Sequence, residues 1–514
     1  MHTTAAITKI NIIFRRNHLP ILSANVYKNC IDYANCEHSV IPAGNCSYFP
    51  LGHHMLKREE LIHIFFELSS MLLLLMVGLY FTAKSGLFQI RGLRFISRHT
   101  LRTILKNDSR TEGVSAFQAL TTALAGTMGV GNISGVATAL VAGGPGAIAW
   151  MWLSAILGMS TKYAEIFLAV KFHRIKNGQR TGGAMYYIED GLGMKRLAAT
   201  FALLCALCSL GIGNLAQINS ISGVMKEGLA VPPIICGVVV AALTGLVICG
   251  GTLRIVRVTE LLIPMLSIIY LFFCAAFLWI NRGLVPAAFS RIIMGAFGLR
   301  EAAGGALGYG VSRAMRLGLS RGVFTNEAGL GSAPIAHASA NCREPSHQAA
   351  WGVFEVFLDT IVMCTITALV ILCAGGGRLL DSGLDGAPLT AAAFESAFPG
   401  IGAIFLAIAI AFFAFAAITG WYFYGESALL YLFKGRRAVG LYRIIFLVCI
   451  LVGPFVELGA VWHISDILNS LMAIPNCIAL LLLGGQVQWG DKSIGRKFHK
   501  YSKNNPKNSQ PVLE

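Results

Sequence analysis

The sequence predicts an all-α protein that crosses a membrane about eleven times. Hydrophobic residues make up 55% of the 514-residue chain and charged residues only 13%, and the mean hydropathy is +0.66. A soluble protein of this length needs far more charge to cover its surface, whereas lipid-facing helices need almost none. The apolar residues also gather into separate runs of roughly 20, which is the length of one membrane-spanning helix.

The apolar runs define a transmembrane domain over residues 55–485, which is followed by a basic tail over residues 486–514. The predicted spans are residues 62–82, 115–141, 147–170, 197–225, 232–251, 258–281, 302–320, 350–373, 400–425, 441–460 and 465–484. The seventh span is the weakest, because Arg313, Arg316 and Arg321 lie in or directly after its second half.

Lysine and arginine gather in alternate loops, which predicts how the chain is oriented. Cytoplasmic loops of membrane proteins carry an excess of these residues. Basic loops follow the first, third, fifth and ninth spans, and the tail after Gln486 is basic as well. The odd number of spans then places the N-terminus outside and the C-terminus in the cytoplasm. The net charge of +16 follows from these loops, and no basic face of a soluble domain indicates nucleic-acid binding.

Residues 1–54 do not fit this pattern. They are polar and without periodicity, and Arg15 and Arg16 would lie on the outer side. They contain no signal peptide with an apolar core and a small-residue cleavage site. We expect translation to begin at or near Met55, with residues 1–54 an extension or disordered. Peptides from this segment in mass spectra of the native protein would contradict that expectation.

The second predicted span contains a cluster of glycines near its middle. Glycine costs about 1 kcal/mol relative to alanine inside a helix, so Gly129-Val130-Gly131-Asn132 weakens the helix at one level. Backbone groups freed at membrane depth are tolerated where they line a cavity, and broken helices of this kind bind substrates and ions in many secondary transporters. Close helix packing through Gly131-x-x-x-Gly135 is the alternative, and the residues alone do not decide between the two.

A second glycine-rich stretch, Gly304-Gly305-Ala306-Leu307-Gly308-Tyr309-Gly310, lies in the seventh span. Two interrupted spans that lie five apart are typical of transporters built from an inverted five-plus-five repeat. The pair therefore favours a transporter whose helices break at both stretches, although Gly304-x-x-x-Gly308 also suits helix packing.

Several longer motifs extend beyond these glycines. They are Gly129–Ile133, Gly135–Ala139, Gly143–Ala147, Trp150–Trp152, Thr161–Glu165, Gly182–Glu189, Arg321–His337, Gly420–Glu426 and Met472–Asn476. Together these motifs, which lie between about residues 60 and 485, resemble the alanine or glycine:cation symporter family of secondary transporters.

The resemblance implies a LeuT-like fold with one additional N-terminal helix. It also implies uptake of a small neutral amino acid, alanine or glycine, across a bacterial inner membrane, driven by a cation gradient that is usually sodium. The substrate would then meet Thr127, Gly129, Gly131 and Asn132 in the broken span. No cofactor is implied beyond the coupling ion, sodium or a proton. The implied partners are the amino acid and membrane lipid, with no obligate protein partner.

By the same resemblance, Gln217 and Trp421 line the substrate pocket. The Gln217 amide lies inside an apolar span and needs a polar partner, which is either the substrate or another helix. Trp421 lies near the cytoplasmic end of its span, so an anchor at the membrane interface is the alternative to a pocket wall.

The cation site is where the sequence departs from the family pattern. Sodium takes oxygen ligands, and the fold implies carbonyls near Ala125 and Met128 together with adjacent Ser and Thr hydroxyls on the ninth span. This chain has Ala416 and Ala417 at those positions. Thr419 points about 200° away from Ala417 around a helix, so it replaces the hydroxyls only if the helix shifts. Sodium symport with a weakened site, proton coupling and uncoupled exchange or facilitated transport all remain alternatives.

Acidic residues inside the spans are the other candidates for ion chemistry. Glu355 and Asp359 lie four residues apart in the eighth span and share one face of a helix. Because charge inside a membrane is costly, they indicate either a proton route or a structural pair bonded to Thr360 or a neighbouring helix. Glu165 and Lys162 are expected to form an ion pair at the inner interface.

The loop after Asn326 is expected on the cytoplasmic side. Glu327 would either close an inner gate by pairing with Arg321 or another basic residue, or anchor a rigid turn. His337 and His347 show no metal-ligand spacing, so no metal site is expected. No Ser/His/Asp set or P-loop indicates an enzyme or an ATP-driven pump, and no short filter between pore helices indicates a channel.

Overall fold

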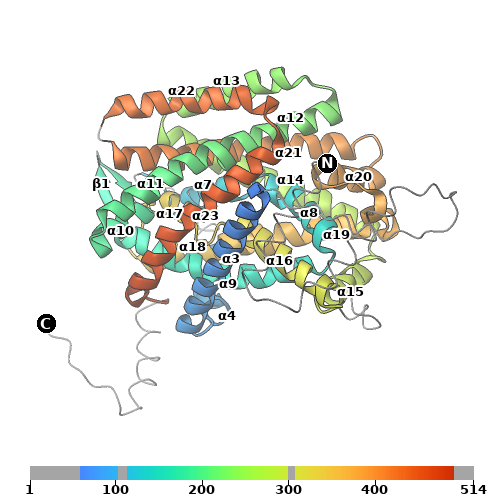
Figure 1. The fold of residues 1–514 in the computed structure, drawn as a ribbon, viewed down its shortest axis with the longest axis horizontal. Coiled ribbons are helices and arrows are strands. Elements are labelled where there is room, and N and C mark those ends of the chain that lie inside the picture. Colours follow the sequence, from blue (N-terminus) through green and yellow to red (C-terminus); the bar gives the residue numbers. More distant parts are fainter. Residues whose placement is uncertain (1–57, 102–112, 177, 299–306, 434, 491–514) are drawn as a thin grey trace, which may run out of the picture. The chain divides into compact units, whose positions relative to one another are not determined.

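The computed structural model describes residues 58–101, 113–176, 178–298, 307–433 and 435–490 (Figure 1). The predicted extension 1–54 and the tail beyond residue 490 lie outside the described residues. The described chain is predominantly helical, with one short antiparallel hairpin of β1 (Arg174–Lys176) and β2 (Gln179–Thr181). The predicted all-α class is confirmed.

The α-helices, in chain order, are α3 (Arg58–Ser85), α4 (Phe88–Arg91), α5 (Leu93–His99), α7 (Ala116–Thr127), α8 (Ser134–Gly143), α9 (Ala147–Lys171), α10 (Ala184–Leu192), α11 (Lys195–Leu210), α12 (Ala216–Leu229), α13 (Pro233–Cys249), α14 (Thr252–Ile280), α15 (Val285–Ala296), α16 (Leu307–Asn326), α17 (Ala333–His337), α18 (Pro345–Val356), α19 (Thr365–Cys373), α20 (Gly386–Ala397), α21 (Gly402–Leu432), α22 (Arg436–Val452) and α23 (Leu458–Leu483). Short 3-10 or π segments are η1 (Val130–Asn132), η2 (Gly211–Leu215), η3 (Phe357–Cys364), η4 (Ala374–Gly377), η5 (Leu379–Ser382), η6 (Gly453–Phe455) and η7 (Gly484–Gln486).

Eight stretches of the described residues are long and apolar enough to cross a membrane. They are Leu68–Ser85, Ala147–Lys171, Lys195–Leu229, Thr252–Ile280, Pro345–Gly377, Gly402–Leu432, Arg437–Phe455 and Val461–Gln486. Shorter apolar helices cover Ser134–Gly143, Pro233–Cys249 and Val285–Ala296. The chain is therefore a multi-pass membrane protein, while the predicted number of spans and the inverted repeat stay predictions.

The second predicted span is broken into two helices. Its first half, α7, starts at a capping box in which the side chains of Ser115 and Gln118 each accept a hydrogen bond from the other's backbone N–H, so two otherwise unpaired donors are satisfied. The helix ends at Thr127, Gly129 leaves the helical region with φ −102° and ψ −146°, and α8 resumes at Ser134 after η1. The interruption predicted from the glycine cluster is confirmed.

The seventh span is also interrupted, but not at the glycine-rich stretch. Residues 304–306 lie outside the described residues, whereas residues 307–310 begin α16, which continues to Asn326. The chain leaves the helix only over residues 327–332 and resumes as α17. The predicted break is therefore wrong for residues 307–310.

Backbone conformation explains where this second break lies. Backbone φ is 52° at Glu327, 91° at Gly329 and 83° at Gly331, and glycine adopts such angles without strain. By contrast, a glycine inside a helix costs only about 1 kcal/mol, which close packing can offset. Within α16, a Cβ at Gly318 would lie 2.2 Å from the Ala147 carbonyl of α9, so glycine there permits close packing on α9.

Two π-helical segments, η2 and η3, interrupt longer helices. η2 separates α11 from α12, and η3 separates α18 from α19. Such π segments occur frequently at functional sites. Gln217 is the second residue after η2, and Asp359 lies within η3. Both side chains are polar and buried.

Helix α9 is the enclosed centre of this arrangement. It packs against α3, α16 and α18 (Figure 1), and every residue from Leu157 to Val170 is buried. Lys162 and Glu165, one turn apart on this helix, are both 0% exposed. The helix therefore brings two charged side chains into the protein interior beside the second break.

Candidate functional site

The first break brings the backbone of η1 to the amide of Gln217. The Val130 N–H donates to Gln217 Oε1 across 3.5 Å, and Gln217 Nε2 donates to the Ile212 carbonyl of η2 at 3.2 Å. A Cβ at Gly129 would lie 3.0 Å from Gln217 Oε1 and 3.3 Å from the Ala417 methyl group. Gly129 thus occupies a crowded point between α12 and α21.

Asn132 contacts Asp359 at the other side of the break. Asn132 Nδ2 donates to Asp359 Oδ1 at 2.7 Å and to the Asp359 carbonyl at 3.0 Å. The second carboxylate oxygen accepts from Thr360 Oγ1 at 2.9 Å. Sequence reasoning singled out both Asn132 and Asp359, but it missed their contact. The two residues lie 227 positions apart, so only the folded chain shows that they form one cluster.

The two breaks lie close to one another. A Cβ at Gly131 would have Thr325 Oγ1, in the last turn of α16, as its nearest neighbour at 3.9 Å. Gly131 therefore leaves open space between the breaks. Thr127, in contrast, turns its hydroxyl back to its own helix, where Oγ1 lies 3.5 Å from the Ala123 carbonyl and 3.4 Å from the Leu124 carbonyl.

Trp421 is enclosed by protein and is only 1% exposed. A Cβ at Gly213 in η2 would lie 2.2 Å from Trp421 Cβ, so glycine is required for α21 to approach this closely. The Trp421 ring also meets that of Tyr424, with centroids 5.5 Å apart. This burial contradicts the interfacial anchor, and the pocket wall stays a prediction.

The residues expected to bind a cation lie where α21 packs on the end of α7, and their role stays a prediction. A Cβ at Gly420 would lie 3.3 Å from the Ala125 carbonyl carbon, so α21 packs directly on the backbone of α7. However, Thr419 Oγ1 donates to the Ala416 carbonyl of its own helix at 2.7 Å. Met128 accepts a contact from Ser267 Oγ through its sulfur at 3.6 Å. The helix shift that Thr419 would need is therefore not present.

Glu165 holds the second break in place. Its carboxylate accepts from the Gly329 N–H at 3.1 Å and from the Gly331 N–H at 3.0 Å. Asn476 Nδ2 donates to the same carboxylate at 2.6 Å and to the Gly329 carbonyl at 2.8 Å, and Tyr187 donates to the Asn476 side-chain oxygen. Two glycine N–H groups that a continuous helix would bond internally are thus satisfied by a carboxylate, which stabilises the non-helical conformation.

A buried ion pair lies next to this cluster. Lys162 Nζ lies 3.3 Å from Glu355 Oε1, and His337 Nε2 lies 2.9 Å from Glu355 Oε2. The expected interfacial pair of Lys162 with Glu165 is therefore wrong, because both side chains are fully buried and Lys162 pairs with Glu355. Glu327 is also buried, and its carboxylate accepts from Ser332 Oγ at 2.5 Å, a contact within the turn that matches the anchor and not the gate of the two alternatives.

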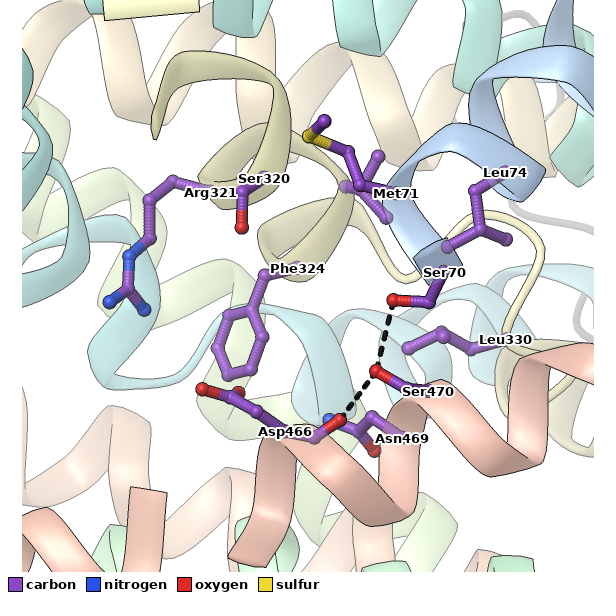
Figure 2. A pocket seen from close by; sticks show the side chains of 11 residues that line it. Ser70, Met71, Leu74, Ser320, Arg321, Phe324, Leu330, Asp466, Asn469 and Ser470 are labelled. Atoms are coloured by element: carbon purple, nitrogen blue, oxygen red, sulfur yellow. Dashed lines mark hydrogen bonds between the residues drawn. The ribbon is translucent and has the colours of Figure 1, made fainter. Parts of the chain in front are cut away.

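A small polar cavity of about 50 Å³ lies beside the second break, between α3, α16 and α23 (Figure 2). Ser70 of α3 and Ser470 of α23 share a hydrogen bond of 2.9 Å at its edge. The Asn469 amide is buried there, and neither of its ends has a hydrogen-bond partner within the described part of the chain. By its volume the cavity suits a few water molecules, which would satisfy that amide.

A larger cavity of about 730 Å³ opens on the side of the basic loops. Lys176, Arg180 and Lys195 lie along its outer part. Its lining also includes Ile335 of α17 and Phe423 of α21, two residues after Trp421. The cavity is therefore bordered both by basic residues and by residues of α17 and α21.

Known proteins similar to this chain are membrane transporters. The sodium:alanine symporter family matches residues 58–512. An uncharacterized transporter of Haemophilus influenzae is 45% identical over 415 residues, which cover 80% of this chain and 90% of that protein. The sodium/alanine symporter AgcS of Methanococcus maripaludis is 42% identical over 446 residues, 85% of this chain and 96% of its own. A solved Na+-coupled sialic acid symporter covers 80% of this chain and 82% of its own at 14% identity, with a TM-score of 0.48.

Proposed function

Because this chain belongs to the sodium:alanine symporter family and is a cation-coupled amino-acid symporter, we propose that it imports alanine or glycine with sodium as the coupling ion. It is a transporter and not an enzyme. The proposed location is the bacterial inner membrane, with the N-terminus outside and the C-terminus in the cytoplasm, as the basic loops indicate. The relative AgcS, a sodium/alanine symporter, supports both sodium and alanine. We favour this reading over proton coupling and over uncoupled exchange or facilitation.

The first break is the observation that carries the proposal. Backbone groups of η1 leave the helical pattern beside the amides of Gln217 and Asn132. The start of a half-helix, here α8, carries partial positive charge and receives the carboxylate of an amino-acid substrate in transporters of this design. Freed carbonyls and side-chain oxygens at the end of α7 would meet the ammonium group.

The surrounding residues support a small substrate. Gly129 has no room for a methyl group without displacing Gln217 or Ala417. Trp421 is a bulky, buried wall on α21. The open space is at Gly131, whose nearest neighbour is Thr325. A side chain of one methyl group or none suits this space, and larger side chains would meet the walls.

The larger cavity supports release toward the cytoplasm. Its lining combines basic residues with residues of α17, which follows the second break, and of α21, which carries Trp421. In symporters with broken helices, rocking of one group of helices exposes a fixed site alternately to each side. We propose that this cavity is the inner part of that route.

Uptake into proteoliposomes tests the proposal. Alanine or glycine should accumulate inside when an inward sodium gradient is imposed, and an ionophore that collapses the gradient should abolish the accumulation. Downhill flux alone, or accumulation driven by a proton gradient without sodium, would contradict sodium symport. Failure of both amino acids to enter under any gradient would contradict the proposed substrate class.

The substitution Asn132→Ala tests the site itself. It should abolish uptake and leave membrane insertion and the monodisperse elution of the purified protein intact. The matched control is Asn281→Ala, since the Asn281 amide donates to the Phe277 carbonyl at the end of α14, away from both breaks. The control should transport as the wild type does. Normal uptake by the Asn132 variant would exclude the first break as the substrate site.

A further inference from the structure

The large cavity on the side of the basic loops carries an excess of positive charge. Its lining holds one acidic side chain, that of Glu189, and four basic side chains, those of Arg174, Lys176, Arg180 and Lys195. Arg174 Nη2 lies 3.1 Å from the Glu189 carboxylate and also pairs with Asp190, which follows Glu189 in the chain. The acids beside the cavity therefore share one arginine, and three basic residues remain.

These three basic side chains have no acidic partner within the described part of the chain. Lys176 Nζ donates to the Tyr186 hydroxyl at 3.1 Å, and Arg180 Nη1 donates to the Cys342 carbonyl. The Lys195 side chain makes no hydrogen bond or ion pair with the residues that the structure describes. Since an ammonium group has three donors and a guanidinium group five, most of these N–H groups are left for water or for an anion.

Two long helices begin in the same lining. Helix α11 starts at Lys195 and α14 starts at Thr252. Neither helix has a side-chain cap or an acidic residue in its first turn, so the partial positive charge of both helix starts adds to that of the basic side chains. This excess of donors and positive charge suits an oxyanion such as a phosphate group.

Part of the lining is apolar and exposed. Leu430 and Phe433 lie at the end of the membrane-spanning helix α21, line the cavity and are 45% and 51% exposed. A soluble phosphate compound would use the donors but not these side chains. A phospholipid has both a charged head group and apolar chains, and basic pockets at the cytoplasmic ends of membrane-spanning helices bind anionic head groups. The lining as a whole therefore favours a lipid.

We propose that this cavity binds the head group of an anionic phospholipid from the leaflet on the side of the basic loops. Lys176, Arg180 and Lys195 contact the phosphate, while Leu430 and Phe433 contact the start of the acyl chains. The cavity volume of about 730 Å³ lies within the range of roughly 300–1,000 Å³ that is usual for sites of small organic ligands.

The lipid would have a structural consequence beyond its own site. The lining combines residues of the β1–β2 hairpin, α11 and α21, so one bound head group contacts three separate elements around the proposed release route. Anything that binds only the folded protein stabilises it, and this lipid would stabilise these elements as they are packed here. Its binding requires neither the transported amino acid nor the coupling ion.

Binding of short-chain lipids to the purified full-length protein tests this site. Dioctanoyl phosphatidylglycerol, which is anionic, is compared with dioctanoyl phosphatidylcholine, which has the same chains but no net charge, and with inorganic phosphate. The sodium concentration is held constant and no amino acid is added. Native mass spectrometry measures bound ligand, and thermal unfolding measures the stabilisation. The anionic lipid should bind at least about tenfold more tightly than either of the other two ligands.

The double variant Lys176→Gln with Arg180→Gln removes two of the proposed phosphate contacts. It should weaken binding of the anionic lipid at least about tenfold, and binding of the uncharged lipid should not change. If this variant fails to fold, Lys195→Gln replaces it, because the Lys195 side chain has no partner to lose among the described residues. That single change should weaken binding of the anionic lipid about fivefold.

Lys84→Gln with Arg254→Gln is the matched control. Lys84 Nζ donates to the Tyr80 hydroxyl at 2.8 Å, as Lys176 does to a tyrosine, and Arg254 Nη1 donates to the Leu246 carbonyl at 2.8 Å. Neither residue lines the cavity. The control removes the same charge from the same side of the protein, so it should bind the anionic lipid as the wild type does.

Three outcomes would overturn the proposal. Equal affinity for the two lipids would mean that the charge is not recognised. Equal affinity for inorganic phosphate and the anionic lipid would make the occupant a soluble phosphate compound. Unchanged lipid binding in the cavity variants would exclude the cavity as the site. Failure of alanine and glycine uptake would instead overturn the proposed function and leave the lipid site intact.

Discussion

The two helix breaks of this protein differ in what satisfies their polar groups. At the second break, the carboxylate of Glu165 accepts from the N–H groups of Gly329 and Gly331. At the first break, the Asn132 oxygen lacks a partner within the described residues and Gly131 faces open space. The second break is therefore held by the protein itself, whereas the first is the break that we propose to bind a ligand. Two interruptions of similar length thus differ in how their polar groups are satisfied.

The carboxylates of one membrane-spanning segment show the same contrast. Glu355 in α18 is paired with Lys162 and His337 next to the second break. Asp359, about one turn later in η3, reaches the first break and contacts Asn132. The hydrogen bonds of Asp359 with Thr360 and with Asn132 of another segment match the structural alternative raised by the spacing, and so does the ion pair of Glu355. The partners nevertheless differ in charge, because those of Asp359 are neutral groups and Glu355 has Lys162.

Among the substitutions that test this difference between Glu355 and Asp359, we expect the largest effect, a loss of folding stability, from Lys162→Met. Removing one partner of a buried ion pair leaves the other charge uncompensated and costs about 3–5 kcal/mol of folding stability. Asp359→Asn removes a charge without stranding another, so it should change stability by less than about 1 kcal/mol. Thermal unfolding in detergent, followed by size-exclusion chromatography, measures both variants side by side.

The double variant Lys162→Met with Glu355→Gln is the control for that experiment. Because it removes both charges, it should recover part of the lost stability, and the difference measures the coupling between the two residues. If Lys162→Met proves no less stable than Asp359→Asn, then Glu355 is not a structural pair and the contrast between the two breaks fails.

A smaller effect, on transport alone, is expected from Gly129→Ala at the first break. The added methyl group would lie 3.0 Å from Gln217 Oε1 and 3.3 Å from the Ala417 methyl, so the Gln217 amide must move. The KM for alanine should rise about tenfold, equivalent to about 1.4 kcal/mol of lost substrate binding. Uptake kinetics in proteoliposomes measure this change.

Gly135→Ala is the matched control for this substitution. Gly135 lies in α8, and a Cβ there would meet no other atom within 4 Å. Its KM should stay at the wild-type value, and the helix should gain roughly 0.5–1 kcal/mol from the better helix former. Equal KM values for the two alanine variants would show that the first break is not shaped around its substrate at Gly129.

The sequence indicated the first break but not the position of the second. The glycine cluster at Gly129–Asn132 left close helix packing as an alternative, and the second glycine-rich stretch and the family motifs favoured a break, which coincides with the structure. At the second break the signal is not local, because Glu165 on another helix stabilises the turn at Gly329 and Gly331. Glycines earlier in α16, such as Gly318, instead permit close approach to α9. The number of glycines in a stretch does not show whether they break a helix or let two helices pack closely.

The candidate site was likewise predictable only in part. The motif around Gly129 and Asn132 indicated the broken span, and burial of Gln217 and Trp421 beside η2 agrees with their expected surroundings. The contact between Asn132 and Asp359 depends on how two distant segments pack, and the amide and carboxylate lie in spans with no shared motif. The length of an apolar run predicts a membrane-spanning helix, but it does not predict which other helices pack against it.

The smallest expected effect comes from restoring the hydroxyls of the family pattern with the double change Ala416→Ser and Ala417→Thr. Both residues are fully buried on α21, which packs on α7 at Ala125, so new hydroxyls would add oxygen ligands near the first break. We expect the sodium concentration for half-maximal uptake to fall about threefold, since the two neutral hydroxyls together contribute less than about 1 kcal/mol once their lost packing is included. The effect should persist in Asp359→Asn if the new hydroxyls bind the ion without the Asp359 carboxylate. Loss of the effect in that background would instead mean that the new hydroxyls and the Asp359 carboxylate bind the same ion. That single cation site would then lie between α21 and η3.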